Sequence, residues 1–424
     1  MEINPLEGRR VRFLNVIEEL SAPGEWYLDR ESKKLYIYPY PGFDEQSIIT
    51  FNPRHKNMGS VFKLYNTKQI SFKNIEFANV GTKVFDIEKS SNISVENCKI
   101  SDILETVLQA KESTYISIIG NTVKDTSSSV ISIEGGDTAN LIKANNYISD
   151  NDISRFALDS RICNPAVQIF GYGTTVRRNK IYDTPHMAIG ISGMGVTIEY
   201  NEIYNVCNET ADAGAIYSGQ YPHLQENVIR YNYFHDIRNR TGLGFSVNTV
   251  YFDDLGGSFD VYSNIFYNVE QGSLVGGGRS NRFWSNAFID CDTSVVIDSR
   301  GAKTENYEDN RAYVNLYWSP YRSELWKKEF PLLYSIMEDE PKLPKYNKII
   351  KNAYINTASE ILYDEAASLT EHSGNITLTT EEAGFWDYEN HNFSLRENSK
   401  IYQKIEGFNL PKASEIGIQS NPGV

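Results

Sequence analysis

Five copies of one short pattern occur in the middle of the chain: VRRNKIY (176–182), IEYNEIY (198–204), IRYNYFH (229–235), VYSNIFY (261–267) and FWSNAFI (283–289). Each copy has a central asparagine among apolar or aromatic residues, and the asparagines are 22, 31, 32 and 22 residues apart. Similar copies occur at Asn121, Asn146 and Asn352, with earlier variants at Asn74 and Asn97. A repeat of about 22–25 residues, lengthened by loops in some copies, indicates a solenoid of stacked units.

The repeat unit consists of strands and turns. Ankyrin and tetratricopeptide units are near 33 to 34 residues and largely helical, whereas this unit is rich in β-branched and aromatic residues, separated by Gly, Asn and Asp. The frame of a leucine-rich repeat is absent. About 22 residues fit one rung of a parallel β-helix, with three short strands and three turns. The 39 asparagines of the chain suit such a fold, because like residues stack at ~4.8 Å in successive rungs. We expect the five central asparagines to stack in one turn.

The two ends of the chain differ from the repeats. Residues 1–60 contain WYL and LYIY on either side of a DRESKK turn, which predicts a β-hairpin or small sheet. Residues 61–424 form the β-helix, interrupted by an insertion at 302–346. After Ala353 the pattern fades into a tail that we expect to cap the solenoid.

The insertion has the pattern of a helix. Its apolar residues recur at helical spacing, and a proline follows them. We expect a single helix that ends at Pro341 and carries on one face Trp326, Phe330, Leu333 and Ile336.

Composition excludes several kinds of partner. The chain has 41 Lys and Arg against 55 Asp and Glu, a net charge of −14, which argues against nucleic-acid binding. No stretch approaches the ~20 apolar residues of a membrane span, and the first residues show no signal-peptide core. The four cysteines form no C-x-x-C pair, so we predict neither a metal site nor a cofactor.

Five strand-like segments carry polar residues at their ends: DTPHMAIGISG (183–193), ETADAGAIYSG (209–219), NTVYFDDLGG (248–257), QGSLVGGGRS (271–280) and VVIDSRG (295–301). If they are equivalent strands of successive rungs, they form one sheet. One face of this sheet then gathers the side chains of Tyr217, Ser218, Asp253, Asp254, Asp298 and Arg300. His186 and Asp212 precede their strands, and loops implied by the longer gaps lie beside them. Such a face is a candidate glycan site.

Glycoside hydrolysis requires two carboxyl groups, one of them protonated. We favour Asp212 and Asp253. Asp212 lies in ADAGA, where poor solvation would raise its pKa towards an acid role. Asp253 is adjacent to Asp254, and two neighbouring carboxylates can have widely separated pKa values. Counting residues stacks the pair one rung apart. Matching AIYSG (215–219) to VYFDD (250–254) instead places Asp212 before its strand and Asp253 at the end of the next, with a wider gap.

Structural roles explain the same residues equally simply. Asp212 is then a turn aspartate, Asp253 and Asp254 end a strand, and His186 is a packed turn histidine. Arg279 and Arg300 either bind sugar hydroxyls or offset the acidic residues.

The chain resembles a known enzyme family. GEWYLDR (24–30) and LYIYP (35–39), the five polar segments above, and WKKEFP (326–331) with FSLRENSK (393–400) resemble β-helix glycosidases of glycoside hydrolase family 141. The resemblance implies a right-handed parallel β-helix of the pectin-lyase type. It also implies a secreted or periplasmic enzyme with α-L-fucosidase or xylanase activity on plant polysaccharide, and an aspartate pair matching Asp212 and Asp253.

The sequence therefore predicts a glycoside hydrolase that acts on a polysaccharide or oligosaccharide. Asp212 and Asp253 are the predicted catalytic pair. The predicted substrate-binding residues are His186, Tyr217, Asp254, Arg279, Asp298 and Arg300. Two alternatives stay open: a polysaccharide lyase on the same fold, and a β-helix that binds glycan without catalysis.

Overall fold

The structure, a computed structural model, describes residues 13–50, 59–303 and 310–419. The contacts divide the chain into two compact units, residues 1–51 and 52–424. In the first unit, β1 (Trp26–Asp29) and β2 (Lys34–Ile37) pair antiparallel after the short helix η1 (Ile17–Glu19). This confirms the predicted hairpin; residues 1–12 and 51–58 of the predicted N-terminal element lie outside the described residues.

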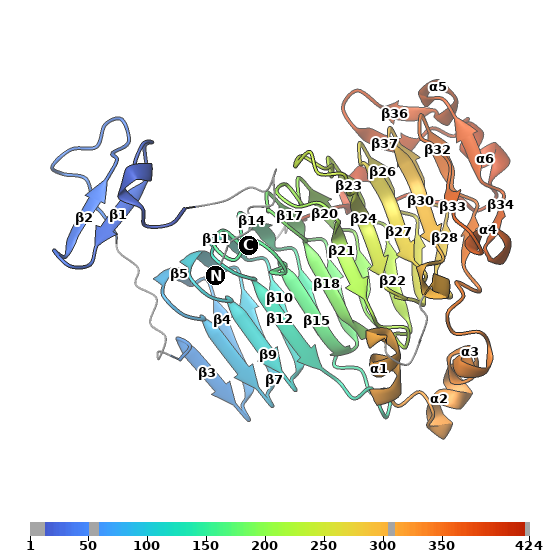
Figure 1. The fold of residues 1–424 in the computed structure, drawn as a ribbon, viewed down its shortest axis with the longest axis horizontal. Helices are drawn as coiled ribbons and strands as arrows, with labels where there is room; N and C mark the ends of the chain where they lie inside the picture. Colours follow the sequence, from blue (N-terminus) through green and yellow to red (C-terminus); the bar gives the residue numbers. More distant parts are fainter. Residues whose placement is uncertain (1–12, 51–58, 304–309, 420–424) are drawn as a thin grey trace. The chain divides into compact units, whose positions relative to one another are not determined.

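The second unit is a right-handed parallel β-helix. Its described residues form three parallel sheets of 11 strands each, which run side by side along the solenoid (Figure 1). Each strand pairs with the strand three positions later in the chain, as β18 pairs with β21. The predicted fold class is therefore confirmed.

We name the sheets by the order in which the chain enters them. Sheet 1 contains, in spatial order, β3 (Phe62–Tyr65), β6 (Phe85–Glu88), β9 (Leu108–Lys111), β12 (Ile131–Gly135), β15 (Val167–Tyr172), β18 (Ile189–Met194), β21 (Ala213–Gly219), β24 (Val247–Asp253), β27 (Gln271–Gly276), β30 (Thr293–Asp298) and β33 (Ile361–Leu362). Sheet 2 contains β4 (Lys68–Lys73), β7 (Ser91–Glu96), β10 (Thr114–Ile119), β13 (Asn146–Ser149), β16 (Thr174–Arg177), β19 (Thr197–Glu199), β22 (Asn227–Arg230), β25 (Phe259–Tyr262), β28 (Arg282–Trp284), β31 (Lys348–Ile350) and β34 (Glu371–Ser373). Sheet 3 contains β5 (Glu76–Val80), β8 (Lys99–Ile103), β11 (Thr122–Thr126), β14 (Asp152–Ser154), β17 (Lys180–Tyr182), β20 (Glu202–Tyr204), β23 (Tyr233–His235), β26 (Ile265–Tyr267), β29 (Ala287–Ile289), β32 (Ala353–Ile355) and β35 (Ile376–Leu378).

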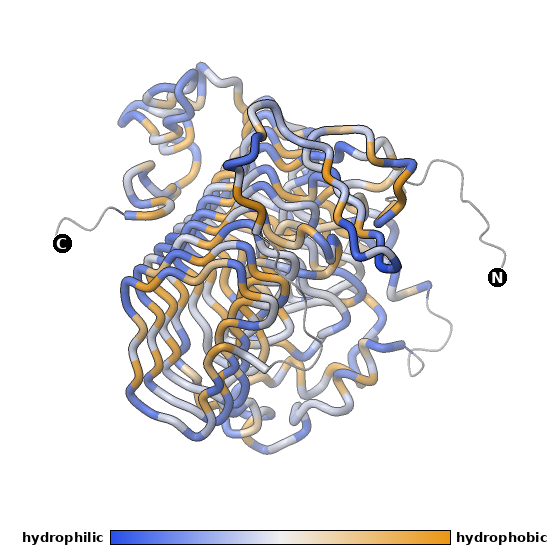
Figure 2. The backbone as a smooth tube through the Cα atoms, turned by 90° about the vertical axis from the view of Figure 1, so that its left-hand side faces the viewer, coloured by the Kyte–Doolittle hydropathy of each residue, from blue (hydrophilic) through white to orange (hydrophobic). Residues whose placement is uncertain are grey.

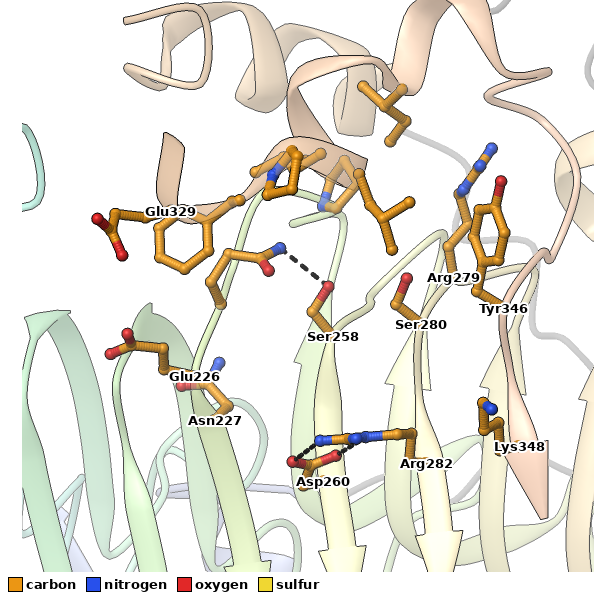
Figure 3. Close-up of a pocket in the computed structure, with 17 residues that line it drawn as sticks. Glu226, Asn227, Ser258, Asp260, Arg279, Ser280, Arg282, Glu329, Tyr346 and Lys348 are labelled. Carbon is orange, nitrogen blue, oxygen red and sulfur yellow. Dashed lines mark hydrogen bonds and ion pairs between the residues drawn. The ribbon is translucent and has the colours of Figure 1, made fainter. Parts of the chain in front are cut away.

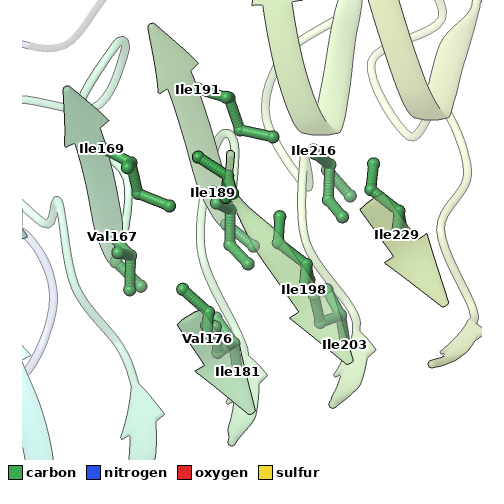
Figure 4. Close-up of a cluster of buried hydrophobic side chains, with 14 of the residues drawn as sticks. Val167, Ile169, Val176, Ile181, Ile189, Ile191, Ile198, Ile203, Ile216 and Ile229 are labelled. Atoms are coloured by element: carbon green, nitrogen blue, oxygen red, sulfur yellow. The ribbon is translucent and has the colours of Figure 1, made fainter. Parts of the chain in front are cut away.

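The core fills the space that the three sheets enclose. Strand alternation sends every second side chain inward, so that Val167, Val176 and Ile181 of one rung meet there from three sheets (Figure 4). The next rung repeats the arrangement, because Val167 pairs with Ile189. Each fully buried aliphatic side chain contributes about 1.5–3 kcal/mol. In Figure 2 the coils lie one behind another, and residues of like hydropathy form rows.

A ladder of buried asparagines runs along the turn between sheets 2 and 3. Each Nδ2 donates to the Oδ1 of the next asparagine at 2.8–3.1 Å. The same Oδ1 also accepts from the backbone N–H of the preceding asparagine, for example at 2.9 Å between Asn201 and Asn232. The members are Asn121, Asn151, Asn179, Asn201, Asn232, Asn264, Asn286, Asn352 and Asn375. The expected stacking of the five central asparagines is confirmed.

Three asparagines of the predicted repeat do not belong to this ladder. Asn146 is the first residue of β13 in sheet 2, where its Oδ1 accepts from the backbone N–H of Ile116. Asn74 and Asn97 lie one position earlier, at φ values of 57° and 52°. Cys98 takes the ladder position after Asn97, and its N–H donates to Asn121. A loop lengthens the rung before Asn146, because Ser117 pairs with Tyr147. Asn74 and Asn97 instead occupy the preceding position in rungs without such a loop, where Lys68 pairs with Ser91 and Ser91 with Thr114. Counting from one asparagine to the next fails at all three.

The insertion is broken into short helices, so the single predicted helix is wrong. It contains η2 (Arg300–Lys303), α1 (Arg311–Trp318), α2 (Glu324–Glu329), α3 (Pro331–Tyr334) and η4 (Ile336–Glu338). Pro331 starts α3, because a proline has no N–H to continue α2 and forces the preceding Phe330 out of helical geometry. Trp326, Leu333 and Ile336 are nevertheless buried as predicted. Residues 304–309 of the predicted insertion lie outside the described residues.

The C-terminal tail continues the solenoid further than predicted, since β34 and β35 complete another rung. It then forms α5 (Thr380–Ala383), the antiparallel pair β36 (Phe385–Asp387) and β37 (Asn392–Leu395), α6 (Lys400–Lys404) and η5 (Ala413–Glu415); α4 (Ala366–Leu369) precedes β34. Phe385 and Phe393 pack with Ile289 of sheet 3. The Gly417 N–H donates to the Tyr200 carbonyl at 2.8 Å. Through these contacts the tail packs on the outer face of sheet 3. No helix in the described ranges is long and apolar enough to cross a membrane.

Candidate functional site

The candidate site lies on the outer face of sheet 1, where β21, β24, β27 and β30 end. Alternation points Ile216, Val250 and Phe252 into the core, so Tyr217, Tyr251 and Asp253 lie on the outer face. Gly219 pairs with Asp253, and Gly276 pairs with Asp298. Two strand ends therefore carry aspartates, and the two others carry glycines.

The register corrects two details of the sequence analysis. Ile216, rather than Ala215, pairs with Val250, so the matched segments slide by one residue. Ser218 pairs with Phe252 and is 1% exposed; it lies on the core side and does not belong to the outer face. The expected placement of the two acids holds, because Asp212 immediately precedes β21 and Asp253 ends β24. The poor solvation expected at Asp212 is wrong, because Asp212 is exposed.

Arg300 lies at the centre of an acidic group that we call the Asp–Arg cluster: Asp212, Tyr217, Tyr251, Asp253, Asp254, Asp298 and Arg300. The guanidinium contacts Asp253 at 2.5 Å, Asp298 at 2.8 Å and Asp254 at 3.5 Å. Gly276 provides the space for it, since a Cβ there would lie 2.6 Å from the guanidinium carbon.

Asp212 joins the cluster through Tyr251. The Tyr251 hydroxyl donates to Asp212 Oδ1 at 3.2 Å, and Arg300 Nη1 donates to that hydroxyl at 3.5 Å. With the 2.5 Å contact of Arg300 to Asp253, the two Oδ1 atoms lie at most about 9 Å apart, which does not exceed the upper limit of ~9.5 Å for the carboxyl pair of a glycosidase. Both predicted acids therefore reach one site.

The environment of Asp253 raises the pKa of its carboxyl group. Burial raises the pKa of Asp253, and the charge of Asp254 raises it further, while Arg300 and the Tyr251 and Tyr217 hydroxyls act in the opposite direction. Tyr217 donates to Asp253 Oδ2 at 3.0 Å. The pKa of Tyr217 is raised by burial and by Asp253, so the tyrosine stays a proton donor at neutral pH.

His186 lies before β18, as expected, but makes a structural contact. Its Nδ1 accepts from the backbone N–H of Cys163 at 3.2 Å. Burial lowers the pKa of His186 to about 4, so the ring is neutral at pH 7. These features fit a packed turn histidine better than a sugar ligand.

Arg279 belongs to a different part of the surface. Its guanidinium donates to the Asp339 and Glu340 carbonyls at 2.7 and 2.9 Å, and it pairs with the Asp339 carboxylate. It therefore holds the insertion against the rungs. It lines a cavity of about 590 Å³ between Phe330–Ile336 and sheet 2, in which Arg282 is paired with Asp260 (Figure 3).

Three residues of the site were missed by the sequence analysis. Tyr251 and Gly276 are described above, and Gln220 donates its side-chain amide to Asp254 at 3.2 Å. Tyr251 could have been predicted, because it lies two positions before Asp253 in a strand and therefore faces the same side of the sheet. The part of the chain that the structure describes contains no group of three His, Cys, Asp or Glu side chains arranged to hold a metal ion.

Comparison with known proteins gives weak relationships. No family model matches the chain, and no curated protein matches it. Among solved structures, a protein titled glycoside hydrolase is similar over 65% of this chain and 57% of its own, with 14% identity and a TM-score of 0.43. The complex of XylC with xylose is similar over 82% of this chain and 65% of its own, again with 14% identity and a TM-score of 0.43. The chain thus spans less than two thirds of either protein.

Proposed function

We propose that this protein is a glycoside hydrolase that acts on a plant or other complex polysaccharide, as an α-L-fucosidase or a xylanase of the family 141 type, outside the cytoplasm. The observation that carries the proposal is the pair Asp212 and Asp253, which share one outer face, with carboxyl oxygens at most about 9 Å apart. Tyr217, Tyr251 and Arg300 surround the pair with hydrogen-bond donors.

The environments of the two acids suggest their roles. Asp253, whose pKa is raised, is the proton donor to the leaving-group oxygen. Asp212 then acts on the opposite side of the glycosidic bond, either on a water molecule or on the sugar carbon. Tyr251 orients Asp212 through its hydroxyl. Arg300 contacts Asp253 directly. It also contacts the hydroxyl of Tyr251, which in turn holds Asp212. Arg300 therefore helps to position both acids.

A polysaccharide lyase is less well supported. A lyase must neutralise the carboxylate of a uronic acid, which requires a cation that is available to the substrate. The charge of Arg300 is shared among Asp253, Asp254 and Asp298, and Arg279 is engaged by Asp339. The acidic surroundings instead suit a neutral sugar.

The products distinguish the three functions. Wild-type protein should be incubated with nitrophenyl glycosides, xylan and pectin, and the products followed by reducing-end release and ultraviolet absorbance. A glycoside hydrolase releases reducing ends and forms no unsaturated product. A lyase also forms an unsaturated product, which absorbs in the ultraviolet. Binding without any product would contradict both enzymes and indicate a glycan-binding scaffold.

The pH dependence of hydrolysis should change when Asp254 is replaced by asparagine. Activity requires protonated Asp253, so kcat/KM falls as the pH rises through the pKa of Asp253. The Asp254 charge raises this pKa, and its removal lowers it. We therefore expect the alkaline limb of the pH–rate profile to move to lower pH in Asp254→Asn. An unchanged or opposite shift would contradict the assignment of Asp253 as the acid; Asp125→Asn, on sheet 3, is the matched control.

A further inference from the structure

A second cavity, of about 300 Å³, lies at the ends of earlier strands of the same sheet as the Asp–Arg cluster. Helix α1 of the insertion forms one wall of it, and the ends of β15 and β18 form its floor. Among the described residues that line it are Ser192, Tyr221, His223, Asn315, Trp318 and Trp326.

Two hydrogen bonds connect this cavity to the cluster. Asn315 of α1 donates to the Gln220 carbonyl at 2.7 Å, and the Gln220 side chain donates to Asp254 at 3.2 Å. If the register that pairs Gly190 with Tyr217 continues, Ser192 lies beside Gly219, which pairs with Asp253; two strands correspond to roughly 10 Å at ~4.8 Å per strand. A short oligosaccharide that reacts at Asp253 can therefore extend into the cavity.

The floor of the cavity contains two glycines. Gly171 and Gly193 lie in successive strands of sheet 1. A Cβ at Gly193 would come within 2.8 Å of the Gly171 carbonyl oxygen. Glycine is therefore required there by the close approach of the two backbones, and the outward-facing side chain of the floor is that of Ser192.

An exposed tryptophan stands at the wall. Trp318, the last residue of α1, is 79% exposed, whereas Trp326 in the same cavity is buried and donates its indole N–H to Thr138 at 3.0 Å. An exposed indole beside a polar cavity offers a flat apolar surface, together with an N–H donor. The apolar face of a pyranose ring matches such a surface.

The described lining contains no Lys, Arg, Asp or Glu side chain. His223 is neutral at pH 7, since burial lowers its pKa to about 4. A uronic acid placed here would leave its carboxylate without a counter-charge, which is costly in a partly enclosed cavity. A neutral sugar instead meets the hydroxyl and amide groups of Ser192, Tyr221 and Asn315.

From these observations we propose that the cavity between α1 and the ends of β15 and β18 binds a neutral pyranose unit of the substrate chain, with Trp318 stacked on the sugar ring. This inference rests on the proposed function, because it places the substrate across the Asp–Arg cluster. It predicts an enzyme that prefers oligosaccharides to monosaccharide glycosides.

Binding measurements test the inference. Calorimetry with Asp253→Asn, which prevents turnover, should use xylohexaose, cellohexaose and mannohexaose as neutral probes and hexagalacturonate as the acidic probe. We expect at least one neutral probe to bind. Adding Trp318→Ala should weaken that binding about tenfold or more, and Trp318→Phe should restore most of it. Trp386→Ala is the matched control, because Trp386 is also exposed (62%) but lies on β36 in the tail.

Three results would overturn the inference: no neutral probe binds, hexagalacturonate binds most tightly, or Trp318→Ala leaves affinity unchanged. Failure of the proposed function looks different. If a neutral probe binds in a Trp318-dependent manner but the wild-type protein converts no glycan, the hydrolase proposal fails while the sugar site stands.

Discussion

Replacement of Asp253 by asparagine should lower kcat/KM for a good substrate by about 10²–10⁴-fold, the usual contribution of a general acid. Asparagine keeps the shape of the side chain, but its single amide oxygen can accept from only one of Tyr217 and Arg300, which donate to different oxygens of Asp253, and its amide group cannot act as a general acid. Asp212→Asn should cause a loss of similar size, because the second carboxylate acts directly on water or on the sugar. Steady-state kinetics on the substrate found by product analysis measures both effects.

Stability separates a catalytic loss from a folding defect. Asp253 is partly buried with a raised pKa, so its charge is unfavourable in the folded protein, and a neutral amide should leave the melting temperature nearly unchanged. Asp125→Asn, at the Asp125–Arg155 pair of sheet 3, should retain full activity. Near-normal turnover by Asp212→Asn would remove that residue from the chemistry. Near-normal turnover by Asp253→Asn would leave the cluster with only a structural role.

The candidate site shows which features a linear sequence reveals. Tyr217, Asp253 and Asp298 were predictable, because period-2 alternation and the repeat length bring strand ends together. The sequence also placed Arg300 on this face, but its contacts were not predictable, since the Asp253 and Asp254 carboxylates of one rung and the Asp298 carboxylate of another surround it only in three dimensions. Nothing local distinguishes Arg300 from Arg279, yet one lies in the cluster and the other holds the insertion.

The fold was more accessible to prediction than the site. Buried asparagine is rare unless it is hydrogen-bonded, so a regularly repeated asparagine among apolar residues indicates a stacked ladder. The prediction failed where the environment, and not the residue type, decides the position: Asn146 follows another asparagine but begins strand β13 of sheet 2. At Pro331 the apolar periodicity was correct but the missing N–H ended the helix.

The ladder should also dominate the response of stability to mutation. The side chain of Asn232 makes five hydrogen bonds. Its Oδ1 accepts from the N–H and Nδ2 of Asn201, and its Nδ2 donates to the Oδ1 of Asn264 and to the carbonyls of Ile198 and Arg230. In Asn232→Leu, buried partners on both neighbouring rungs lose a bond, at about 1–3 kcal/mol for each unsatisfied group. We expect the free energy of unfolding to fall by at least about 3 kcal/mol, as measured by urea denaturation.

A matched variant decides whether the loss comes from the ladder. Asn398 is exposed in the tail, and Asn398→Leu should change the free energy of unfolding by less than about 0.5 kcal/mol. Because each rung contacts only its neighbours, the damage at Asn232 should be local. Hydrogen exchange should therefore increase first at Asn201 and Asn264, and later at distant rungs. If Asn232→Leu unfolded at the same urea concentration as the wild type, leucine packing would replace the hydrogen bonds, and the ladder would set the register of the rungs without stabilising them.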